Sequence, residues 1–73
     1  EPNQPIWPLL LGRVYMIQDD RSKWDLAYDA LTQAVRLLDE RIPRAEGTMR
    51  EIMVNQRNMA TQWIEELRER VRQ

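Results

Sequence analysis

Apolar residues recur along most of the chain with the period of an α-helix. In the middle third, successive apolar positions are separated by four, three, four, three and four residues and share one helix face: Trp24, Tyr28, Leu31, Val35, Leu38 and Ile42. Alanines and leucines beside this face widen the apolar arc to roughly 200°. Because one partner cannot cover such an arc, we predict a helix over 23–42 that packs against two neighbours.

Capping signals indicate where two long helices begin. The tetrapeptides that start at Ser22 and at Thr48 both have the pattern of a capping box, in which a hydroxyl and a carboxylate satisfy free N–H groups of the first turn. A proline and a glycine interrupt the helical pattern between the two segments. A second apolar stripe then continues to Val71, which predicts a helix over 48–72, antiparallel to the first.

The beginning of the chain is rich in proline, which disfavours helix before Pro8. Residues 1–7 are therefore predicted to be an irregular lead-in, followed by a short helix over 8–18. The apolar positions that we expect to face the core in this helix are Leu10, Val14 and Ile17. Gly12 weakens the prediction of helix, unless a neighbouring element packs closely against it.

These elements predict an all-α fold, a small three-helix bundle with a short first helix packed on a long antiparallel helical hairpin. With 73 residues, the chain is long enough for a single domain, which we place at 8–73. No apolar run reaches the roughly 18 residues of a membrane span, so the sequence favours a soluble and intracellular protein without fixing its compartment.

The composition removes most catalytic chemistry. The chain has no cysteine and no histidine, and its one serine, Ser22, has a capping role. We therefore expect no metal, no cofactor, no small-molecule substrate and no enzymatic activity. One enzymatic alternative stays open, since a helical bundle can stabilise developing charge with arginines, but those arginines would have to lie inside the bundle.

Arginine dominates the basic residues, although the net charge is only −1. Four arginines project from one side of the predicted helix 48–72 and form a ridge: Arg50, Arg57, Arg68 and Arg72. Such a ridge could hold phosphates or an acidic partner, so nucleic-acid binding is an alternative function. Two observations weigh against it: aromatic residues do not interleave with the ridge, and acids of the helix 23–42, Asp39 among them, could pair with it across the hairpin.

The large apolar surface of the two long predicted helices favours a different function. The wide arc on 23–42 and the long stripe on 48–72 exceed what a short first helix can cover. We therefore predict a protein–protein interaction module, most simply a homodimer or scaffold element that associates through helix 48–72 and the flank of 23–42. The expected interface anchors are Ile52, Met53, Met59, Trp63 and Leu67, and the ridge arginines would fix orientation.

Overall fold

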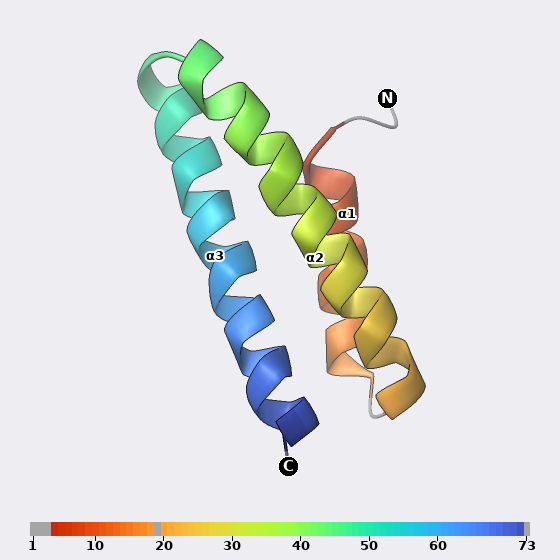
Figure 1. The fold of residues 1–73 in the computed structure, drawn as a ribbon. Helices are drawn as coiled ribbons and strands as arrows, with labels where there is room; N and C mark the ends of the chain where they lie inside the picture. Colours follow the sequence, from red (N-terminus) through yellow and green to blue (C-terminus); the bar gives the residue numbers. More distant parts are fainter. Residues whose placement is uncertain (1–3, 19, 73) are drawn as a thin grey trace.

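A computed structural model describes residues 4–18 and 20–72, and this part of the chain is helical without strands (Figure 1). Its elements are α1 (Ile6–Ile17), α2 (Arg21–Arg41), the short 3-10 helix η1 (Ile42–Arg44) and α3 (Gly47–Arg72). The long helices α2 and α3 form an antiparallel hairpin, and α1 packs behind α2 and approaches α3 near its C-terminal end (Figure 1). The predicted fold, a small all-α three-helix bundle with α2 packed on two neighbours, is confirmed.

The core lies where α2 meets the other two helices. Its buried cluster combines one or two large side chains from each helix with small ones: Leu9, Met16, Ala27, Leu31, Ala34, Ala60 and Leu67. Each large side chain buried there stabilises the fold by about 1.5–3 kcal/mol. Among the described residues, no polar or charged side chain is buried, so the bundle is held together by apolar packing and by contacts at its surface.

Gly12 allows α1 and α2 to approach closely. A Cβ atom added at Gly12 would lie 2.7 Å from both Cγ and Cδ2 of Leu31, which is closer than real carbon atoms approach. The alanines of α2 leave similar room on the same side of that helix, since Ala27 and Ala34 are fully buried. A neighbouring element thus packs closely against Gly12, which is the exception that the sequence-based prediction allowed for a glycine inside this helix.

The prediction of which face of α1 is buried was wrong. The buried residues of α1 are Pro8, Leu9, Gly12 and Met16, whereas the predicted core positions Leu10, Val14 and Ile17 are exposed. The physical reason is that α1 is apolar on nearly every side, so its periodicity does not select a face. Gly12 selects the buried face, because the absence of a Cβ atom leaves room for the Leu31 side chain.

All three α-helices also begin earlier than predicted, the third by one residue. The first begins at Ile6, which makes Pro8 its third residue, a position whose N–H would have no partner within the helix. The second begins at Arg21, and its N-cap is Asp20 instead of Ser22: the Asp20 Oδ1 accepts hydrogen bonds from the Ser22 N–H (3.1 Å) and hydroxyl (2.8 Å). The predicted capping role of Ser22 was therefore wrong.

The hairpin turn combines a proline and a glycine, as the sequence indicates. Pro43 lies in η1, and the Ala45 N–H donates to the carbonyl oxygens of Arg41 and Ile42, both at 3.1 Å. Gly47 has a positive φ of 59°, a conformation that favours glycine, and it already opens α3. Thr48 therefore lies inside the first turn of α3.

Candidate interaction surface

Half of the exposed large apolar side chains among the described residues lie on α1, the shortest of the three α-helices. Large apolar side chains at 47–65% exposure occupy the side of α1 opposite to its buried face, and we call this set the α1 stripe: Trp7, Leu10, Leu11, Val14 and Ile17. At 100° per residue these positions fall within an arc of about 120°. A helix that is apolar on both sides resembles a buried helix more than a surface helix, so the α1 stripe is the part of the bundle that most resembles an uncovered core.

The anchors predicted on α3 are distributed between the core and the surface. Leu67 is 1% exposed and belongs to the core cluster, so it offers no surface to a partner. Trp63 is half-buried against the same cluster, and Met53 is also partly buried. Ile52 and Met59 are exposed and remain available. The predicted interface therefore lies on a helix whose central apolar side chains already pack in the core of the bundle.

The α1 stripe was not predicted as a candidate surface, although the sequence contains a signal for it. A sustained lack of polar positions, as in the segment from Ile6 to Ile17, signals that the whole circumference of a helix is to be covered. One side of α1 is covered by α2, and the described part of the chain leaves the other side without a cover.

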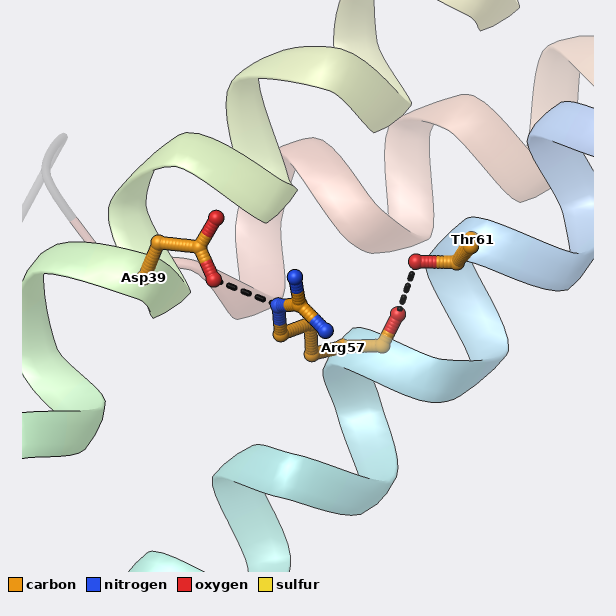
Figure 2. A network of polar contacts seen from close by, with 3 residues as sticks. All are labelled: Asp39, Arg57 and Thr61. Carbon is orange, nitrogen blue, oxygen red and sulfur yellow. Dashed lines mark hydrogen bonds and ion pairs between the residues drawn. The ribbon is translucent and has the colours of Figure 1, made fainter.

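The predicted arginine ridge is partly engaged inside the bundle. Arg57 reaches from α3 to α2 and donates from Nε to the Asp39 carboxylate, as Figure 2 shows, and the Arg57 carbonyl oxygen accepts a hydrogen bond from the Thr61 hydroxyl at 2.9 Å. This contact is the pairing across the hairpin that the acids of α2 suggested. Arg50 is exposed, and the side chain of Arg72 lies outside the described part of the structure.

Arg68, the fourth ridge residue, contacts an aromatic ring of α2. Its Nη2 donates to the Tyr28 hydroxyl at 3.2 Å, and its guanidinium lies 5.8 Å from the centre of the Tyr28 ring. The hydrogen bond to Tyr28 raises the pKa of Arg68, so this guanidinium stays charged. One aromatic ring, that of Tyr28, therefore does accompany the ridge, although it comes from α2 and not from α3 itself.

Other arginines stack on tryptophans where α1 meets the hairpin. Arg21 and Arg70 lie 5.8 and 5.7 Å from the Trp24 ring centre, and Arg13 lies 5.0 Å from that of Trp63. Arg70 Nη1 also donates to the Met16 carbonyl oxygen at 3.1 Å, near the C-terminal end of α1, where a cation is favoured by the helix dipole. The contacts of Arg13 with Trp63 and of Arg70 with Met16 join α1 to α3, whereas Arg21 contacts a ring of its own helix.

A shallow groove of about 410 Å³ lies between the start of α2 and the end of α3. Its walls are mostly apolar, with one acid and one base at the surface: Trp24, Asp25, Tyr28, Leu67, Arg68 and Val71. The Tyr28 hydroxyl and one N–H of the Arg68 guanidinium are already hydrogen-bonded to each other there. The groove therefore offers apolar contact more than a set of unused polar groups.

The described residues contain no cluster of three or more carboxylate, histidine or cysteine side chains that could hold a metal ion. In the same part of the chain, no helix combines the length and the apolar character needed to cross a bilayer. None of the described arginines is buried, so the interior arrangement that the enzymatic alternative requires does not occur among them.

Comparisons with known proteins assign no family to the chain. No family model matches the chain, and neither the curated proteins nor the solved structures contain a significant match.

Proposed function

We propose that this chain is a non-enzymatic helical interaction module that self-associates, most simply as a homodimer, through exposed apolar helix faces. The observation that carries this proposal is the α1 stripe, in which five large apolar side chains are about half exposed on one side of a short helix. Contiguous exposed apolar surface of this kind marks interaction sites in folded proteins, because leaving it in water forfeits about 25 cal/mol for each square ångström.

The hairpin acts as a rigid support for the stripe. The buried side of α1 is fixed to α2 by the contact of Gly12 with Leu31, and its C-terminal end is fixed to α3 by Arg70. Such preorganisation lowers the entropic cost of association, since little has to be ordered when a partner arrives. Ile52 and Met59 are exposed on α3 and provide a second, smaller apolar area.

Paired substitutions of valine test the proposal. Val14 lies in the α1 stripe, whereas Val54 is exposed on α3, so Val14→Gln and Val54→Gln make the same chemical change at two sites. Val14→Gln is expected to weaken self-association at least tenfold, because it places an amide in an apolar contact. Val54→Gln is expected to leave it unchanged. Mass measured by light scattering over a range of concentrations gives both dissociation constants, and equal values for the two variants would contradict the proposal.

A further inference from the structure

We infer that α1 of one copy packs against α1 of a second copy across a two-fold axis, with the α1 stripe at the centre of the interface. This inference rests on the proposed self-association and names the surface that carries it. In an interface with two-fold symmetry, the same patch of each copy is used, so the patch must be complementary to itself.

The charge distribution of α1 meets that requirement. Arg13 is the charged residue within Ile6–Ile17, and its guanidinium lies over the Trp63 ring of α3, 5.0 Å from the ring centre. Two copies of the α1 stripe can therefore face each other without bringing like charges together. A partner recognised through charge would instead need charged groups within the stripe, and the stripe has none.

The exposed apolar residues of α3 are less suited to self-pairing. Met49, Ile52 and Met59 are exposed and share one side of α3 at 100° per residue, but they are spread over about three turns, with the polar residues Asn55 and Gln56 beside them. A self-paired interface on that side would have to cover these polar groups together with the apolar ones, which is unfavourable.

The size of the stripe also fits the central part of a dimer interface. Five half-exposed large side chains amount to a patch of several hundred square ångströms, which is the size of patch that marks interaction sites. A stable dimer buries about 800 Å² on each partner. The stripe thus supplies the apolar centre, and neighbouring surface supplies a more polar rim.

Leu10 offers a direct test because it lies near the middle of α1. Across a two-fold axis through the centre of the stripe, Leu10 of one copy lies close to Leu10 of the other, whether the two helices run parallel or antiparallel. Opposite charges introduced at this position in two different copies should therefore attract, and equal charges should repel.

The experiment compares Leu10→Glu, Leu10→Lys and their equimolar mixture with the wild-type chain by light scattering. Each variant alone is expected to lose at least tenfold in affinity, and the mixture is expected to recover most of the dimer, with an affinity that falls as salt is added. Gln33, which is exposed on α2, provides the matched control. The variants Gln33→Glu and Gln33→Lys should dimerise like the wild type, alone and mixed.

The outcomes separate this inference from the function on which it rests. If the wild type dimerises but mixing the two Leu10 variants does not restore the dimer, pairing of α1 with α1 is overturned while self-association stands. A wild type that stays monomeric at every concentration overturns both. A monomer that binds phosphatidylcholine vesicles, and loses that binding in Leu10→Glu, would assign the stripe to a lipid surface and also overturn both.

Discussion

At the scale of single residues, Gly12 determines how closely α1 lies on α2. Leu31 occupies the space that the Cβ of any other residue would take. In Gly12→Ala, alanine gains about 1 kcal/mol in helix propensity. The overpacking that it causes costs about 1–3 kcal/mol. We therefore expect the free energy of unfolding, measured with urea, to fall by about 1 kcal/mol.

A stabilising effect of Gly12→Ala would contradict this expectation, because it would mean that the Leu31 side chain can move away from the added Cβ atom without loss of packing energy. Gln33→Ala serves as a control at an exposed helical position of α2. Since glutamine and alanine have similar helix propensities, we expect it to change the free energy of unfolding by no more than a few tenths of a kcal/mol.

Asp20 links the stability of α2 to pH. Its hydrogen bonds from the hydroxyl and the N–H of Ser22 lower its pKa below the ordinary value. A carboxylate whose pKa is depressed by folding contributes stability above its unfolded pKa of about 3.9 and loses it as pH falls through the folded pKa. The melting temperature of Asp20→Ala should thus lie below that of the wild type at pH 7, and the difference should shrink as the pH falls below about 4.

Asp20→Asn separates the charge from the hydrogen bond in this experiment. The amide oxygen keeps an acceptor for the Ser22 N–H, but it does not titrate. We expect Asp20→Asn to retain most of the cap at pH 7 and to show a weaker dependence on acid. A gap between the wild type and Asp20→Ala that stays constant from pH 7 to pH 3 would contradict the contribution of the Asp20 charge to the cap.

Single residues also show what a sequence can and cannot reveal about contacts. The pairing of ridge arginines with acids of α2 could be predicted, because an antiparallel hairpin aligns their surfaces, and Asp39 with Arg57 confirms it. The contact of Arg68 with Tyr28 could not, since it joins residues 40 positions apart and depends on how the two helices are rotated. The choice of Asp20 over Ser22 as N-cap could not be predicted either, because it depends on the backbone conformation at the start of α2.

At the scale of elements, the ion pair of Asp39 and Arg57 joins the two long helices at their surface. The side chains are 50% and 43% exposed, so solvent and salt screen their attraction. A double-mutant cycle with Asp39→Asn and Arg57→Gln should give a coupling energy of about 0.2–1 kcal/mol that decreases in high salt. Arg50→Gln, at an exposed position of the same helix, is the control and should show no coupling to Asp39→Asn.

The elements differ in how well the sequence predicts them. The hairpin of α2 and α3 could be predicted because each helix has a polar side that fixes its orientation, and because proline and glycine mark the turn. For α1, the type of element could be predicted but its buried face could not, since apolar residues surround it. The orientation of α1, and with it the candidate surface, depends on the fit of Gly12 to Leu31.

At the scale of the whole molecule, the bundle leaves apolar surface exposed although its core is small. A chain of 73 residues buries about 60% of its unfolded surface, which gives a domain of marginal stability. A second copy placed on the α1 stripe would extend the core beyond one chain. Stability should then rise with protein concentration, because association removes folded monomer from the unfolding equilibrium.

The most direct test is the mass of the wild-type chain by sedimentation equilibrium over a dilution series from millimolar to submicromolar concentration. If α1 pairs with α1 of a second copy, the mass is near twice the monomer value of 8.8 kDa at high concentration and falls to the monomer value on dilution. A mass of 8.8 kDa at every concentration would contradict this pairing.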